Sequence, residues 1–112
     1  MGLEVKTNEI NDVVVVGLVG NLDTNTAPDA EIIINEWLEK GIKKMIINLE
    51  EVKYVSSAGL RIFLATAKKM TASGGVVKLC SANEVVQEIL DISGFSTILD
   101  VKKTEEEALA SI

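Results

Sequence analysis

Two adjacent serines, Ser56 and Ser57, stand where an apolar segment passes into a predicted helix, in the stretch YVSSAGLRIFLA. A serine at a strand-to-helix turn can be the nucleophile of a hydrolase. That chemistry needs the pattern Gly-x-Ser-x-Gly and a base, whereas the residues here are Val-Ser-Ser-Ala-Gly and the chain contains no histidine. Lys68 and Lys69 lie three turns along the same helix, about 16 Å away. We therefore expect a protein that is not an enzyme.

The same stretch has a structural explanation that is only partly sufficient. One serine before a helix is an N-cap, which is worth about 1 kcal/mol over alanine. A second hydroxyl, followed by Ala58 and Gly59, is more than one cap requires, and Gly59 costs a helix interior about 0.5–1 kcal/mol relative to alanine. Small side chains in a row leave the start of the helix open to a partner. The motif therefore indicates a docking or modification site.

The composition is that of one globular domain over residues 1–112, with 47% hydrophobic and 25% charged residues. Seventeen acidic and eleven basic side chains give a net charge of −6, which disfavours binding to nucleic acid or an anionic membrane. The start of the chain lacks the apolar region of a signal peptide. The single cysteine, Cys80, excludes an intramolecular disulfide. We expect a cytoplasmic protein without metal or other cofactor.

Hydrophobic periodicity predicts a hairpin and then a helix at the start of the chain. Residues 3–6 alternate as an edge strand, and residues 13–19 form a continuous apolar run typical of a central strand. Thr26 and Asp29 resemble a capping box, and Gly41 suits the position just past a helix end. The apolar residues between them recur at helical spacing: Ala30, Ile33, Ile34, Trp37 and Leu38.

The middle of the chain reads as strand, helix and strand. Residues 45–49 form an apolar strand, and the serine stretch leads into a second helix that reaches about Thr71. A glycine pair then precedes a strand over residues 76–80. Leu60, Phe63, Leu64 and Ala67 follow the spacing of a core-facing helix side.

The last part of the chain predicts two more helices around a short strand. Ser81 and Glu84 have the capping-box pattern and open a third helix, which ends at Gly94. A strand over residues 97–101 is followed by a fourth helix capped by Thr104. The order β-β-α-β-α-β-α-β-α predicts an α/β fold with a mixed, largely parallel sheet and about four helices.

Three segments in this order resemble a known family. GNLDTNT before the first helix, INLEEVKYVSSAGLRIFL and GFSTILDV resemble the loop, the signature and the closing strand of the anti-sigma factor antagonists, which are STAS-domain proteins. The resemblance covers essentially the whole chain. It implies a single STAS domain.

The resemblance also implies which residues form the site. The familiar signature reads Asp-Ser-Ser-Gly-Leu, with its first serine phosphorylated. In that register Ser57 is the phosphorylated serine and Ser56 replaces the aspartate. Asp23 matches the family's loop aspartate, which lies close to the phosphorylated serine. The phosphosite and partner-binding environment would be Asp23, Ser56, Ala58, Gly59, Leu60 and Arg61.

What the resemblance implies about function is a bacterial partner switch. The unmodified protein would bind an anti-sigma factor and release the sigma factor. That anti-sigma factor is itself a serine kinase, which uses ATP and Mg²⁺ to phosphorylate the antagonist, and a serine phosphatase reverses the step. The protein would then be a substrate and regulator of transcription signalling.

Alternatives from other classes remain open at this point. The same domain occurs as a scaffold subunit of larger signalling or transport assemblies, with a serine that is never phosphorylated. Small residues at a helix start can also hold an anion, which allows a nucleotide or small-molecule sensor. An esterase would require turnover that Ser57→Ala abolishes.

Overall fold

The chain begins with the antiparallel hairpin that the alternating and apolar segments predict. In the computed structural model, which describes residues 2–112, β1 (Glu4–Ile10) pairs with β2 (Val13–Leu22) around a turn at Asn11. The elements that follow keep the predicted order. They are α1 (Ala27–Glu39), β3 (Lys44–Val55), α2 (Ser57–Ala72), β4 (Val76–Cys80), α3 (Glu84–Ile92), the 3-10 turn η1 (Phe95–Thr97), β5 (Asp100–Lys102) and α4 (Glu105–Ser111).

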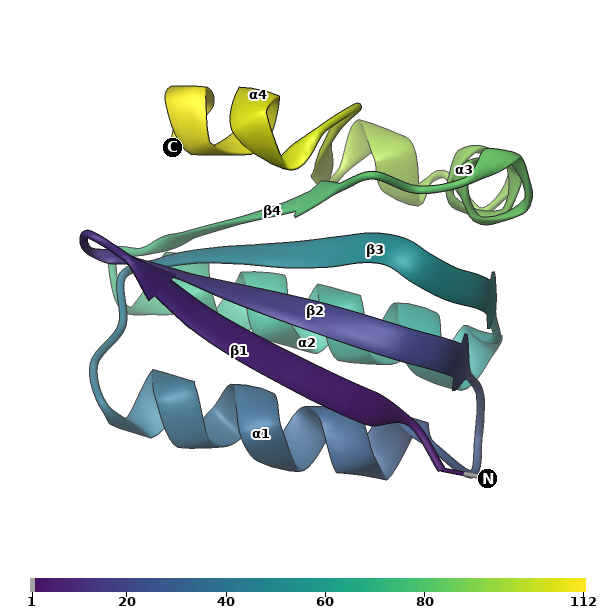
Figure 1. Ribbon diagram of the computed structural model, residues 1–112, viewed down its shortest axis with the longest axis horizontal. Coiled ribbons are helices and arrows are strands. Elements are labelled where there is room, and N and C mark those ends of the chain that lie inside the picture. Colours follow the sequence, from purple (N-terminus) through teal and green to yellow (C-terminus); the bar gives the residue numbers. More distant parts are fainter. Residues whose placement is uncertain (1) are drawn as a thin grey trace.

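The five strands form one sheet in the order β1-β2-β3-β4-β5. Only β1 is antiparallel to its neighbour; β2 to β5 are parallel, so the predicted mixed, largely parallel sheet is confirmed. Each right-handed crossover steps to the next strand in the same direction, which places the connecting helices on one face. In Figure 1, α1 and α2 lie on one side of the strands and α4 lies beyond β4 on the other.

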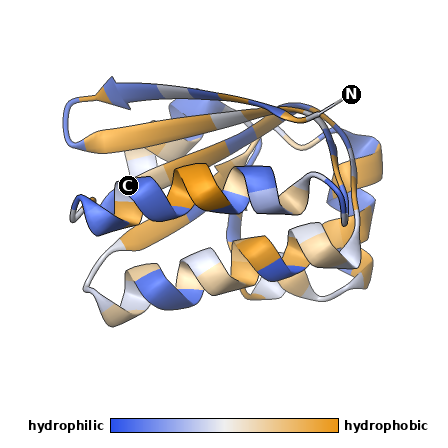
Figure 2. Ribbon diagram, turned by 90° about the horizontal axis from the view of Figure 1, so that it is seen from below, coloured by the Kyte–Doolittle hydropathy of each residue, from blue (hydrophilic) through white to orange (hydrophobic). Residues whose placement is uncertain are grey.

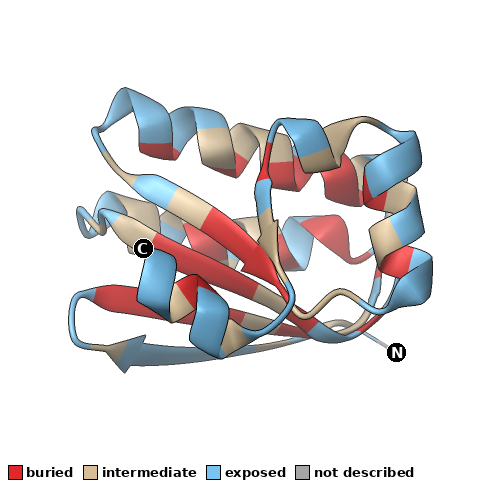
Figure 3. Ribbon diagram, turned by 90° about the horizontal axis from the view of Figure 1, so that it is seen from above, coloured by how far each residue is buried: buried red, intermediate tan, exposed pale blue. Residues whose placement is uncertain are grey.

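The sheet has an apolar core on each face. The larger core packs α1, α2 and α3 against the inner sides of the strands. The smaller one lies under α4, where Ala108 covers Val15, Ile46 and Cys80. Figure 2 shows the apolar residues following the central strands, and Figure 3 shows β1 exposed along the edge. Cys80 is buried at the end of β4, and this burial raises the pKa of its thiol.

Two strand boundaries differ from the predictions. β3 runs from Lys44 to Val55, well beyond the predicted residues 45–49, because it stays paired with β2 across two register shifts. The predicted strand over residues 97–101 is wrong in its first half. Gly94 takes the left-handed region, with φ of 82°, and starts the 3-10 turn that delays β5 until Asp100.

One predicted helix cap is wrong, and a second, Thr26, is the N-cap residue of α1 without the predicted side-chain hydrogen bond. Asn83, rather than Ser81, caps α3, because its Oδ1 accepts the Val86 N–H at 2.8 Å while its Nδ2 donates to the Val52 carbonyl at 2.9 Å. At α1 the Thr26 side chain makes no cap hydrogen bond. Its hydroxyl instead donates to the Asn21 carbonyl at 2.7 Å.

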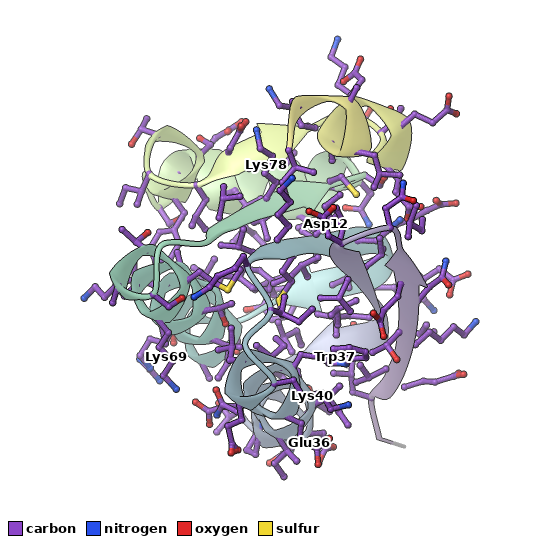
Figure 4. The ribbon with its side chains drawn as sticks, turned by 90° about the vertical axis from the view of Figure 1, so that its left-hand side faces the viewer. Asp12, Glu36, Trp37, Lys40, Lys69 and Lys78 are labelled. Atoms are coloured by element: carbon purple, nitrogen blue, oxygen red, sulfur yellow. The ribbon has the colours of Figure 1, made fainter. Side chains whose placement is uncertain are left out.

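The buried side of α2 is rotated from the predicted one. Leu60 and Phe63 are buried, as predicted, but Leu64 and Ala67 are only partly buried. The remaining buried side chains of the helix interior were not predicted: Ile62, Thr66 and Met70. Trp37 on α1 packs against the larger core, and the Nζ of Lys40 lies 4.3 Å from the centre of its ring. Figure 4 labels both side chains.

An ion pair near the sheet edge gives a pH-dependent contribution to stability. Lys78 is only 9% exposed, and its Nζ lies 2.7 Å from Asp100 Oδ2. The hydrogen bond from Lys78 is the main cause that lowers the pKa of Asp100. A lowered carboxyl pKa stabilises the fold above the unfolded value of about 3.9, and this stabilisation is lost as the pH falls through the folded value.

We expect Asp100→Asn to lower the free energy of unfolding at pH 7 by about 1 kcal/mol, because Lys78 is left without its carboxylate. At about pH 3 the difference from wild type should shrink, since the unfolded chain, with a carboxyl pKa of about 3.9, is then largely protonated at this position and the advantage of the lowered folded pKa falls. Urea unfolding at both pH values measures this. Asp12→Asn is the control, because Asp12 pairs with Lys44 at 3.3 Å with its side chain 72% exposed. Equal losses in the two variants at pH 7 would contradict the argument.

Candidate functional site at the start of α2

The parallel strands β2 and β3 end side by side and bring two loops together. Leu22, the last residue of β2, pairs with Val55, the last residue of β3. The Ser56 N–H donates to the Leu22 carbonyl at 2.8 Å, which continues the pairing one step past the strand. Asp23 and Ser57 are the next residues in the two segments. The loop before α1 and the start of α2 are therefore neighbours at the right-hand end of the sheet in Figure 1.

The two serines have different positions. Ser56 is the N-cap of α2: its backbone is extended and its Oγ accepts the Gly59 N–H at 3.4 Å. Ser57 is the first helical residue and is exposed. Within residues 2–112 its hydroxyl makes no hydrogen bond. The cap thus accounts for one hydroxyl and leaves the other free at the surface.

The Asp23 carboxylate accepts hydrogen bonds from the backbone of its own loop. Its Oδ1 accepts the backbone N–H of Asn25 at 2.9 Å and the N–H of Thr26 at 3.1 Å. These bonds fix the turn that leads into α1 and hold the carboxylate in place. The loop that holds Asp23 follows a strand paired with the one that precedes Ser57, and a place for Asp23 in the phosphosite stays a prediction.

Gly59 has a packing role that the sequence did not reveal. A Cβ at this position would lie 2.8 Å from both Leu22 Cγ and Val55 Cγ1, and both neighbours are buried. Gly59 therefore lets α2 approach the ends of β2 and β3, and it does not leave the helix open to a partner as predicted. Leu60 is buried next to it, and Ala58 is partly buried against the core. A glycine three residues after a cap, following a strand that ends in valine, was the available signal.

Arg61 is the exposed cation of this helix start. No carboxylate oxygen of residues 2–112 lies within 4.0 Å of its guanidinium. Of the lysines considered as a base for Ser57, Lys69 donates to Asn35 Oδ1 at 3.1 Å, on the side of α1. The described residues 2–112 also hold no group of three or more His, Cys, Asp or Glu side chains that could bind a metal ion.

The sequence model of the STAS domain matches residues 4–108. The chain belongs to this family. The resemblance that the serine signature carries is thereby confirmed, together with the single-domain α/β fold. None of the helices in the described part of the chain is long and apolar enough to span a membrane.

Curated relatives of this STAS chain cover nearly all of it. BtrV of Bordetella bronchiseptica, a candidate anti-sigma factor antagonist, is 29% identical over 97% of this chain and 94% of its own length. The anti-sigma F factor antagonist of Paenibacillus polymyxa is 26% identical over 100% of this chain and 97% of its own. The domain therefore stands alone in these relatives.

Solved structures support the same fold. A candidate anti-sigma factor antagonist from Thermotoga maritima superposes with a TM-score of 0.92 at 26% identity, covering 96% of this chain and 93% of its own. SpoIIAA in its unphosphorylated form gives a TM-score of 0.81 at 22% identity, covering 95% and 93%. At that identity the second likeness describes the fold alone.

Proposed function

We propose that this protein is an anti-sigma factor antagonist whose binding is switched by phosphorylation of Ser57. The unphosphorylated form binds an anti-sigma factor in the cytoplasm and so releases the sigma factor. The observation that carries the proposal is that the two serines differ in their contacts: Ser56 caps α2, while the Ser57 hydroxyl is exposed and free of hydrogen bonds within residues 2–112. The names of the relatives support the choice of partner.

The anti-sigma factor is proposed to be the kinase. It holds ATP and Mg²⁺, the Ser57 oxygen takes the γ-phosphoryl group, ADP leaves, and the hydroxyl proton passes to a base of the kinase. A serine phosphatase hydrolyses the phosphoserine and restores the binding form. This protein supplies only the acceptor and is itself no enzyme.

The fold is suited to carry the phosphate. Phosphoserine brings about −1.5 to −2 charges, and the first turn of a helix favours negative charge because its N–H groups are unpaired. The structure of SpoIIAA in its phosphorylated form has a related fold, with a TM-score of 0.74 at 22% identity. Phosphorylation should therefore leave the domain folded and act on its partner.

Phosphate mapping tests the proposal. We expect the purified anti-sigma kinase of the source organism, with ATP and Mg²⁺, to add one phosphate per chain to the wild type and to Ser56→Ala, and none to Ser57→Ala. Intact mass and peptide mass spectrometry measure this. Ser56→Ala loses a cap worth about 1 kcal/mol but keeps the acceptor hydroxyl.

Phosphate on Ser56, or no phosphate on a wild-type chain that does not bind the kinase either, would overturn the proposal. In the second case the scaffold or ligand-sensor alternatives would apply.

A further inference from the structure

Arg61 lies one helical turn after Ser57, on the same side of α2. Residues four apart in a helix have Cβ atoms about 6 Å apart, so their side chains can meet. Both side chains are exposed, and neither has a polar partner among residues 2–112. The order is also favourable, because an acid that precedes a base by four residues agrees with the helix dipole.

We infer that Arg61 is the intramolecular partner of the phosphate on Ser57. The guanidinium presents parallel N–H donors that match a phosphate in two-point contact. This inference rests on the proposed phosphorylation of Ser57. It gives Arg61 a role within the chain in addition to its expected place in the partner-binding surface.

The neighbouring groups leave this role to Arg61. The Asp23 Oδ1 atom is held by two N–H groups of its own loop, and the carboxylate does not lie within 4.0 Å of the Arg61 guanidinium. Glu51 on β3 faces Lys6 of β1, with 3.9 Å between Oε2 and Nζ. The next basic residue along α2 is Lys68, almost two turns beyond Arg61.

The pairing would give the switch two parts. In the unphosphorylated protein the Arg61 guanidinium is free and can contact an acidic group of the anti-sigma factor. After phosphorylation the same guanidinium is held by the phosphate, so its N–H donors are no longer available to the partner. Phosphorylation then adds the charge of the phosphate and also removes a hydrogen-bonding group from the partner surface.

The test uses a chain with phosphoserine installed at position 57 during synthesis, so it needs no kinase. A ³¹P NMR titration between pH 4.5 and 8.5 follows the second ionisation of the phosphate, with a pKa of about 6 for free phosphoserine. We expect Arg61→Gln to raise this pKa by about 0.5 unit, because the dianion loses its counter-charge. The shift should shrink in 1 M NaCl, where the screening length is about 3 Å.

Two matched variants distinguish a specific pairing of Arg61 with the phosphate from a general effect of positive charge on α2. Arg61→Lys keeps the charge without the planar fork and should recover part of the shift, whereas Lys68→Gln removes one positive charge farther along α2 and should leave the pKa unchanged. Identical titrations of wild type and Arg61→Gln, or equal shifts in Arg61→Gln and Lys68→Gln, would overturn the inference. Either result leaves the phosphate mapping of Ser57 unaffected, so the two proposals fail separately.

Discussion

Ser57→Asp is expected to weaken binding of the anti-sigma factor at least a hundredfold while the domain stays folded. The aspartate stands at the first helical position, where the unpaired N–H groups of α2 stabilise a negative charge. In the complex the same charge must lose water, and it lies one loop away from Asp23. A cost of about 3 kcal/mol corresponds to slightly more than a hundredfold in affinity. Isothermal titration calorimetry with the purified anti-sigma factor measures it, and circular dichroism checks the fold.

Two variants control for charge and for the loss of the hydroxyl. Ser57→Ala removes the hydroxyl without adding charge and should bind within about threefold of wild type, a difference of less than 1 kcal/mol. Ser73→Asp adds the same charge at the exposed far end of α2, where the chain already has a net charge of −6. If Ser73→Asp weakens binding as much as Ser57→Asp, overall repulsion rather than the site explains the loss.

The order of elements was predictable because the strands and helices have strong and different periodicities. The apolar run of β2 is buried on both faces, and the sequence marks it as a central strand beside the alternating β1. Each further strand follows a helix, and a helical crossover joins parallel strands, so the alternation of strands and helices predicts the parallel pairing. These features depend on local pattern and chain chirality, which a single sequence contains.

Caps and boundaries were less predictable because several residues compete for each role. Ser81 and Asn83 can both cap a helix, and the tertiary bond from Asn83 to the Val52 carbonyl decides between them. Ser81 instead takes a left-handed backbone conformation, with φ of 65°. The extension of β3 through charged residues likewise depends on its pairing with β2, which periodicity does not contain.

At the candidate site, too, some features could be predicted from the sequence and others could not. The sequence could predict that two serines at one helix start have more than one role, but only the cap geometry separates Ser56 from Ser57. It could also place Arg61 away from the core, because helical spacing assigns exposed positions well. The packing role of Gly59 could not be predicted from the sequence, since it depends on the distance between α2 and the ends of two strands.

Gly59→Ala is expected to lower the free energy of unfolding by about 2 kcal/mol, although alanine is the better helix former. The new methyl group would lie 2.8 Å from Leu22 Cγ and from Val55 Cγ1. Leu22 is 0% and Val55 1% exposed, so both side chains are packed in the core. Overpacking of this kind costs about 1–3 kcal/mol and exceeds the helix propensity gain of about 1 kcal/mol. Urea denaturation followed by circular dichroism measures the loss.

A double-mutant cycle assigns the loss of stability in Gly59→Ala to this contact. Leu22→Ala removes two of the three side-chain atoms nearest to the new Cβ, so Gly59→Ala should cost at least about 1 kcal/mol less in that background than in the wild type. If Gly59→Ala instead stabilises the protein, or costs the same in both backgrounds, α2 does not need its close approach to β2 and β3. The helix would then tolerate larger residues beside Ser57, and the glycine would again require an explanation from the partner surface.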